Sequence, residues 1–385
     1  MEIVRNLSLF AAVALALMSC DRTLKPVINS DEGVRKANPL VETDKLEYSD
    51  AGDFLLSEPF PVYATANTPN GQFLLDGKMT VGKFNGSDKF TSVWASSFSM
   101  MQGGCDTPWL EDNIEGLRRS HIFLGKGKSE EQDGFTDGGM WAIGMHSLMD
   151  GRMACFFHAE SHFESVLVTA YKSIGVSYSS DGGRTWDKGT MILSGPNPKP
   201  ADPEAGGRSY GLGDGCVVWN EKYGKWICYY CGARDGNTDY LLCMAASSDP
   251  SAAPGTWKKW DGKDFTIEGC NASTGLGGKD VPVAGLSQIK GGNPSVSWNT
   301  YLNKWIMVYH SRSREVIFST SADGIAWSAP QVLVSKEMEP KLCVMPNLIG
   351  EEGDLKSGKE FRLYYSTDMK DSGSRTIVGR VIRCK

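Results

Sequence analysis

Three ionisable side chains alternate along one short stretch of the chain. His158, Glu160 and His162 are separated by Ala159 and Ser161. If this stretch continues a β-strand, all three side chains lie on one face, because side chains alternate between faces. Glu160 could then act as a general acid or base, with the histidines binding hydroxyl groups or tuning its pKa. A divalent-cation site and an exposed polar strand end are the alternative interpretations.

A second carboxylate, Asp214, stands between two glycines before an apolar run. A short carboxylate there could point into a central cavity, or it could be a turn aspartate that accepts backbone hydrogen bonds. Glycosidic cleavage needs one carboxyl group to protonate the leaving oxygen and another to activate water or attack the sugar. Glu160 and Asp214 could form this pair. Asp137, which could instead only begin a turn, and Glu339 are further candidates.

The elements that would position these residues are short strands in a repeated pattern. In Gly213–Trp260, runs rich in Val, Tyr, Trp and Ile alternate with turn residues, which predicts an antiparallel meander. The pattern recurs in Gly291–Val334 and, upstream, in Gly138–His162 followed by Lys172–Ser194. Four such strands make one blade of a β-propeller. We therefore expect an all-β, five-bladed β-propeller, with six blades as the alternative.

The two ends of this domain are expected to meet. The last blade has only three predicted strands: Leu342–Ile349, Glu360–Ser366 and Arg375–Ile382. An N-terminal strand could supply the missing one and close the ring. The strands expected before Gly138 are Phe60–Ala66, Gln72–Phe84 and Phe90–Ser99.

One rim of the propeller is expected to carry the site. The first two strands of a blade are antiparallel, so the start of the first and the end of the second share a rim. Polar residues gather at these places and in the long connections that reach them. The expected substrate-binding residues are His158, His162, Trp141, Arg208, Asn293, His310, Arg312 and Lys341. Their alternatives are a buried tryptophan and solvated or salt-bridged rim residues.

Composition is consistent with one large folded domain. The chain has 385 residues, 41% of them hydrophobic, and a formal net charge of −6, which gives no support for nucleic-acid binding. If Cys20 carries lipid, nine of the ten cysteines remain, and we expect most of them to be reduced. Cys228 and Cys231 should point to opposite faces of a strand, which argues against a metal clip between them.

The N-terminal segment predicts export. Arg5 precedes the apolar run Leu7–Met18, which is too short to span a bilayer. Leu17-Met18-Ser19-Cys20 resembles a bacterial lipoprotein lipobox. This resemblance implies a signal peptide over residues 1–19 and lipidation of Cys20. The polar residues that follow predict a tether over 20–46, and the repeated strands predict the propeller over 47–385. The protein would be lipid-anchored in the bacterial cell envelope, with the anchor as its only membrane contact. A plain secretory signal is the alternative.

Two further motifs carry a family resemblance. Ser179-Ser180-Asp181-Gly182-Gly183-Arg184-Thr185-Trp186 matches the Asp-box pattern of sialidases, and Ser321–Trp327 is a shorter variant. An Asp box stabilises a hairpin and is not catalytic. The openings Gly213-Asp214-Gly215 and Gly292-Asn293-Pro294 resemble five-bladed propeller glycoside hydrolases of the arabinanase, xylosidase and invertase type.

The resemblance implies hydrolysis of an oligo- or polysaccharide by paired carboxylates, in a monomer without a cofactor. The alternative is that the protein holds a divalent cation, either for structural support or in its site. A non-catalytic glycan-binding surface lipoprotein is the alternative function, favoured if Asn293 marks the loss of a needed carboxylate. A sialidase-like enzyme is the third hypothesis.

Overall fold

The computed structural model describes most of the chain after residue 39. The described residues are 40–64, 75–96, 99–113, 118–119, 134–163, 166–202, 210–234, 237–286, 290–341, 343–367 and 376–385. The chain divides into two compact units, Met1–Val34 and Arg35–Lys385. The first unit, with Cys20, lies outside the described residues, so the lipobox stays a prediction. Among the described residues, no helix has the length and apolar character needed to cross a membrane.

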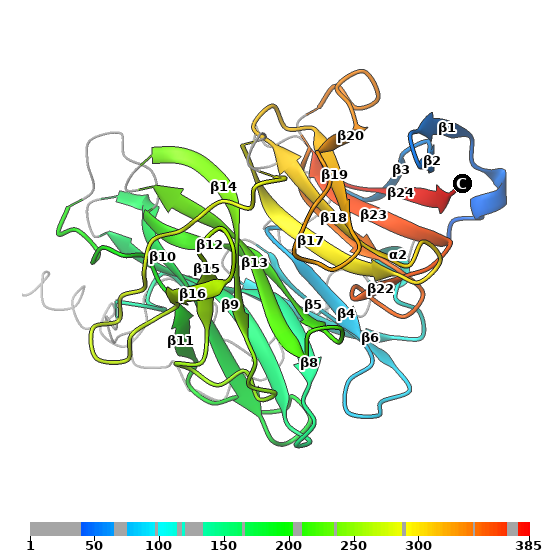
Figure 1. Cartoon of the computed structure of the whole chain (residues 1–385). Coiled ribbons are helices and arrows are strands. Elements are labelled where there is room, and N and C mark those ends of the chain that lie inside the picture. The colour runs from blue at the N-terminus through cyan, green and yellow to red at the C-terminus, as the bar shows by residue number, and fades with distance from the viewer. Residues whose placement is uncertain are drawn as a thin grey trace, which may run out of the picture. The chain divides into compact units, whose positions relative to one another are not determined.

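Nearly all regular structure in the described residues is β (Figure 1). The exceptions are a 3-10 turn, η1 (Thr43–Lys45), and one short helix, α2 (Leu110–Asn113). The strands form consecutive antiparallel sets. The first set contains β4 (Met79–Gly82), β5 (Phe90–Ser96), β6 (Ser99–Cys105) and β7 (Arg118–Arg119). The second contains β8 (Gly139–Ser147), β9 (Met153–Phe163), β10 (Val166–Ser179) and β11 (Thr190–Leu193).

The following sets continue this order along the chain. The third contains β12 (Tyr210–Asn220), β13 (Lys225–Arg234), β14 (Asn237–Ser247), β15 (Lys258–Trp260) and β16 (Phe265–Glu268). It joins the second through a parallel contact between β10 and β12. The next contains β17 (Gly291–Asn299), β18 (Lys304–Ser311), β19 (Val316–Ser321), β20 (Gln331–Val334) and β22 (Lys356–Ser357).

The last set combines both ends of the described chain. It contains β21 (Val344–Ile349), β23 (Glu360–Thr367), β24 (Thr376–Cys384), β1 (Tyr48–Ala51), β2 (Phe54–Ser57) and β3 (Phe60–Ala64). Both β2 and β3 pair with β24. This pairing confirms that N-terminal strands complete the C-terminal set.

The first strands of successive sets contact one another in a cycle. Contacts run from β4 to β8, to β12, to β17 and to β21. The cycle closes where Met79 N of β4 donates a 2.7 Å hydrogen bond to Asn347 Oδ1 of β21. First strands around a centre, with later strands outside them, are the arrangement of a β-propeller. The blade count stays a prediction, because the six-blade alternative places two sets in the region before Gly138, and parts of that region, residues 114–117 and 120–133 among them, lie outside the described chain.

The hydrophobic core lies between neighbouring sets. In the third set, Val217 and Cys228 pack against the second set, whereas Val218 and Ile227 pack against the next one. Both faces of such a strand are buried, which explains why the sequence shows continuous apolar runs. Each fully buried aliphatic or aromatic side chain contributes about 1.5–3 kcal/mol. The strands that carry the candidate site are therefore held on both sides.

The region before Gly138 differs from its expected strands. The expected strand Phe90–Ser99 is two strands, since β5 reverses and pairs with β6 from Ser96↔Ser99 to Phe90↔Cys105. A run of residues suited to strands cannot reveal a reversal within itself, because propensity is the same on either side of a tight turn. The expected strand Gln72–Phe84 is limited to β4 among the described residues.

Candidate active site

The central strands carry a β-bulge near their starts. The pairing register shifts in β12, β17 and β21, and the residue inside each bulge has a left-handed backbone. These residues are Asp214 (φ 47°), Asn293 (φ 54°) and Met345 (φ 53°). A bulge re-aims a side chain, and Asp and Asn tolerate a positive φ better than most residues. Asp214 and Asn293 consequently meet at the centre, where Asn293 Nδ2 donates to Asp214 Oδ1 at 3.4 Å.

The expected strand through His158, Glu160 and His162 is confirmed as part of β9. His158 Nε2 lies 3.2 Å from Glu160 Oε1, and His162 Nε2 lies 2.8 Å from Glu160 Oε2. The Asp214 backbone N–H donates to His158 Nδ1 at 2.7 Å. Because His158 Nδ1 accepts this bond, its proton is on Nε2, and His158 is a neutral donor to Glu160. One imidazole thus links the two carboxylate residues.

Lys172 on β10 is shared by both carboxylates. Its Nζ lies 3.2 Å from Glu160 Oε1 and 3.3 Å from Asp214 Oδ2. Lys172 stands opposite Glu160 in the pairing of β10 with β9, and it is 9% exposed. An ammonium ion so far removed from water needs counter-charges, and these two carboxylates supply them.

The shared ammonium determines the charge state of the site. Burial by itself would raise the pKa of Glu160, but Lys172 and the hydrogen bonds from His158 and His162 hold it well below the usual range. Burial opposes ionisation of Asp214 in the same way, and the Lys172 ammonium lowers its pKa below the ordinary value. Both groups are therefore carboxylates at neutral pH. Either could act as a base or nucleophile, and neither is a proton donor in this state.

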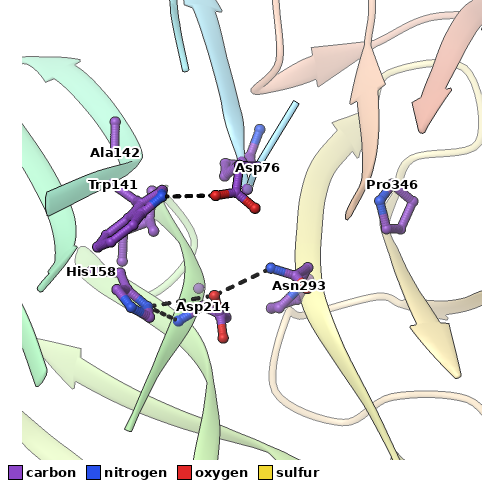
Figure 2. Close-up of a pocket in the computed structure, with 12 residues that line it drawn as sticks. Asp76, Trp141, Ala142, His158, Asp214, Asn293 and Pro346 are labelled. Carbon is purple, nitrogen blue, oxygen red and sulfur yellow. Dashed lines mark hydrogen bonds and ion pairs between the residues drawn. The ribbon is translucent and has the colours of Figure 1, made fainter. Parts of the chain in front are cut away.

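A small pocket of about 10 Å³ lies at the centre, large enough for about one water molecule. Asp76, Trp141, His158, Asp214 and Asn293 line it. Figure 2 shows Asp76 and Asp214 on either side of the space between Trp141 and Asn293. Trp141 Nε1 donates to Asp76 Oδ2 at 3.3 Å. The pocket thus brings together two carboxyl groups that are 138 positions apart in the numbering of the sequence.

Three further expected site residues lie in the wall of this pocket or near it. Trp141 lines the pocket but is only 8% exposed, with its ring edge-to-face against His158. Asp137 precedes Gly138, whose N–H donates to the Glu160 carbonyl, and Asp137 Oδ1 is buried without a hydrogen-bond partner among the described residues. His310 lies beneath Gly292, and burial together with Arg314 lowers its pKa to about 3.

The remaining expected residues fall outside the pocket lining or outside the described chain. Arg312 and Lys341 are exposed, and Glu339 Oε1 accepts a bond from the Lys341 backbone. Arg208 and Cys20 lie outside the described residues. The roles of all these residues stay predictions.

The described residues contain no cluster of three or more His, Cys, Asp or Glu that could hold a metal ion. The eight cysteines whose side chains are described are all free and buried. Cys228 and Cys231 pack into different core clusters, on opposite sides of β13. Their opposite orientation confirms the argument against a clip between them.

Sequence reasoning missed Lys172 and Asp76. Lys172 had a usable signal, since it is a charged residue at the start of an otherwise apolar expected strand. Asp76 precedes Gly77 and the first central strand, much as Asp214 precedes Gly215. The strand was expected to begin at Gln72, and this placed Asp76 inside it and concealed the correspondence.

Comparisons with known proteins give similarity to solved structures alone. No family model and no curated protein sequence matches the chain. A thermostable family-43 glycoside hydrolase is 11% identical over 78% of this chain and 88% of that chain, with a TM-score of 0.44.

Two arabinan-related structures are similar to the same degree. The endo-arabinase from Bacteroides thetaiotaomicron is 14% identical over 84% of this chain and 96% of that chain, with a TM-score of 0.46. The α-L-arabinanase from Penicillium chrysogenum is 12% identical over 84% and 97%, with a TM-score of 0.45. All three of these similarities have TM-scores below 0.5.

Proposed function

We propose that this protein hydrolyses a glycosidic bond in an oligo- or polysaccharide. One observation carries the proposal: the central pocket is lined by two carboxyl groups, Asp76 and Asp214, and Asp214 is held ionised by Lys172. Glycosidic hydrolysis needs two carboxyl groups with different roles at one site. The pocket also has the size of one water molecule, the second reactant.

The ionised state of Asp214 assigns its role, and Asp76 takes the remaining one. Asp214 would activate the water or attack the sugar, because it is ionised and faces the pocket. Asp76 would supply the proton to the leaving oxygen. Glu160 is bound by two imidazoles and Lys172, so we assign it the role of a positioning residue that holds Lys172 and His158 against Asp214. Asp137 and Glu339 do not line the pocket, and the proposal does not need them.

The test is release of reducing ends by the full-length protein in detergent, across plant, algal and host glycans. Asp214→Asn and Asp76→Asn should each lower the rate by about 10²–10⁴-fold, since each removes an acid or base. Glu268→Gln, at a surface carboxylate paired with Lys258, should match wild type. Cleavage that persists in both Asp214→Asn and Asp76→Asn would place the chemistry elsewhere.

A non-catalytic glycan-binding protein is the second candidate, and a specific observation favours it. The Asp214 carboxylate accepts hydrogen bonds from Lys172 and Asn293, while its backbone N–H donates to His158. A carboxylate engaged in this way could serve only to organise a binding surface. Glycan binding without release of reducing ends from any member of the panel would support this candidate over hydrolysis.

A further inference from the structure

A second and much larger cavity lies at the other end of the central strands. After its bulge at Asp214, β12 continues to Asn220. After its bulge at Asn293, β17 continues to Asn299. The cavity opens where these strands end and has a volume of about 470 Å³, within the range of small-molecule binding sites. Its lining residues are Val218, Trp219, Asn220, Glu221, Lys222, Trp298, Thr300, Trp305, Ala322, Leu355 and Lys356.

Two partly exposed indole rings form part of its apolar walls. Trp219 and Trp298 occupy the same place in β12 and β17, and each crosses a buried tryptophan edge-to-face: Trp226 at 5.0 Å and Trp305 at 5.3 Å. Trp219 and Trp298 are partly exposed at the edge of the core, whereas their partners are buried. Each partner fixes the orientation of its exposed ring. A rigid, partly exposed indole is suited to pack against the C–H face of a sugar ring while its N–H meets a polar group.

One residue that lines this cavity has a buried hydrogen-bond acceptor with no partner among the described residues. Asn220 is 1% exposed, and its Nδ2 donates to the Asp323 carbonyl at 2.7 Å. Its Oδ1 accepts no hydrogen bond from any described residue. An unpaired buried acceptor costs about 1–3 kcal/mol, so such groups are rare without a reason. A ligand that donates an O–H here would remove that cost.

The neighbouring set provides an internal comparison. Asn299 follows Trp298 as Asn220 follows Trp219, and it is also buried. Its Oδ1 accepts a bond from Leu302 N at 2.7 Å, and its Nδ2 donates to the Gly358 carbonyl at 2.7 Å. The side-chain oxygen is therefore satisfied at Asn299, which does not line the cavity, and unsatisfied among the described residues at Asn220, which does. The missing bond is a feature of the cavity rather than of the fold.

The groups at the cavity mouth favour a ligand rich in hydroxyls. Glu221, Lys222, Thr300 and Lys356 are exposed and supply both donors and acceptors. With one acidic and two basic residues, the mouth has no strong excess of either charge. We propose that this cavity is a second saccharide-binding site, in which sugar rings pack on Trp219 and Trp298 and a hydroxyl donates to Asn220 Oδ1. The site lies away from the central carboxylates and does not depend on hydrolysis there.

The test uses the full-length protein in native gels containing xylan, linear arabinan, mannan or a mixed-linkage β-glucan. Ala322→Arg should fill the cavity from an exposed position and weaken retardation by at least one polymer by about tenfold or more. Ala326→Arg is the matched control, since Ala326 is exposed in the same loop but does not line the cavity. It should be retarded like wild type.

A second variant distinguishes loss of binding in the cavity from a local effect of the Ala322→Arg substitution on folding. Thr300→Trp fills the same cavity from the turn after β17 and should weaken retardation by the same polymer, with the thermal unfolding of both variants close to wild type. Asp214→Asn should not change the retardation that depends on this cavity, that is, the part that Ala322→Arg and Thr300→Trp weaken. Lack of retardation by all four polymers, or equal retardation of Ala322→Arg and Ala326→Arg, would overturn the proposal.

Discussion

The charge balance of the central site depends on a single residue, Lys172. Two carboxylates approach its ammonium within 3.3 Å, and both have lowered pKa values because of it. Without Lys172, Glu160 and Asp214 would be two like charges linked through His158 in a partly dry environment. A pair of this kind cannot remain fully ionised.

Lys172→Met should destabilise the protein by about 3–5 kcal/mol at neutral pH, because it leaves buried carboxylates without their counter-charge. In wild type the pKa of Glu160 is depressed. Its stabilisation is therefore present above the unfolded pKa of about 4.3 and is lost as the pH falls through the folded value. The variant lacks this contribution, so its free energy of unfolding should decrease less on acidification from about pH 7 to about pH 4.

Urea unfolding followed by tryptophan fluorescence measures both effects. Lys258→Met is the control, since Lys258 pairs with Glu268 on the surface and should contribute less than about 1 kcal/mol. Equal destabilisation by the two substitutions, or an unchanged pH dependence in Lys172→Met, would show that Lys172 does not set the charge state of the site.

At the scale of secondary structure, the bulges interrupt the alternation of side chains between the two faces of the central strands. This interruption re-aims polar side chains into the candidate site. Asp214 and Asn293 hold left-handed conformations at two of these bulges, and Met345 holds the same conformation at the third. Asp and Asn can stabilise this conformation through local hydrogen bonds, whereas methionine has no such group. The third bulge is therefore strained by its residue type.

Met345→Asn should raise the free energy of unfolding by about 0.5–1 kcal/mol, because asparagine tolerates a positive φ better than methionine. Chemical denaturation checks this. Met149→Asn is the matched control, since Met149 is 82% exposed and has no positive φ; it should change stability by less than about 0.5 kcal/mol. A loss of stability in Met345→Asn would mean that packing of the methionine outweighs the backbone strain.

At the scale of the whole described fold, the chain is held together where its ends pair. Beyond the backbone pairing of β2 and β3 with β24, Ser57 Oγ accepts a 2.8 Å bond from Val381 N. Arg380 Nη1 donates to the Ser57 carbonyl at 2.9 Å. Ser57 is 1% exposed, so these bonds are protected from water.

Ser57→Ala should destabilise the fold by about 1–3 kcal/mol, because it leaves the buried Val381 N–H without its acceptor. Amide exchange of Val381, with the global unfolding free energy, is the measurement. Ser49→Ala removes a hydroxyl from the exposed strand β1 and should change stability by less than about 0.5 kcal/mol. Unchanged protection of Val381 in Ser57→Ala would show that this bond does not secure the closure.

The fold class, the repeated strands and the alternation of His158, Glu160 and His162 on one face were all predictable from the amino-acid sequence. These features depend on local rules: the period of two along a strand, the residues that favour turns, and the similarity between repeats. The pairing of the N-terminal strands with the last set was also predictable, because a set with one missing strand leaves an unpaired edge.

Which charged residues meet depends on how the strands pair and pack in three dimensions. Lys172 and Asp214 lie 42 positions apart, and Asp76 and Trp141 lie 65 apart, so no local pattern links either pair. The direction of the Asp214 side chain depends on a bulge, which exists only when β12 is paired with β13. Asn220 and Asn299 each come directly after a tryptophan in the sequence. The Oδ1 of Asn299 accepts a hydrogen bond, whereas that of Asn220 accepts none from the described residues, because different residues surround the two side chains. Side-chain partners across sheets are set by register and packing, and the sequence of one strand does not contain either.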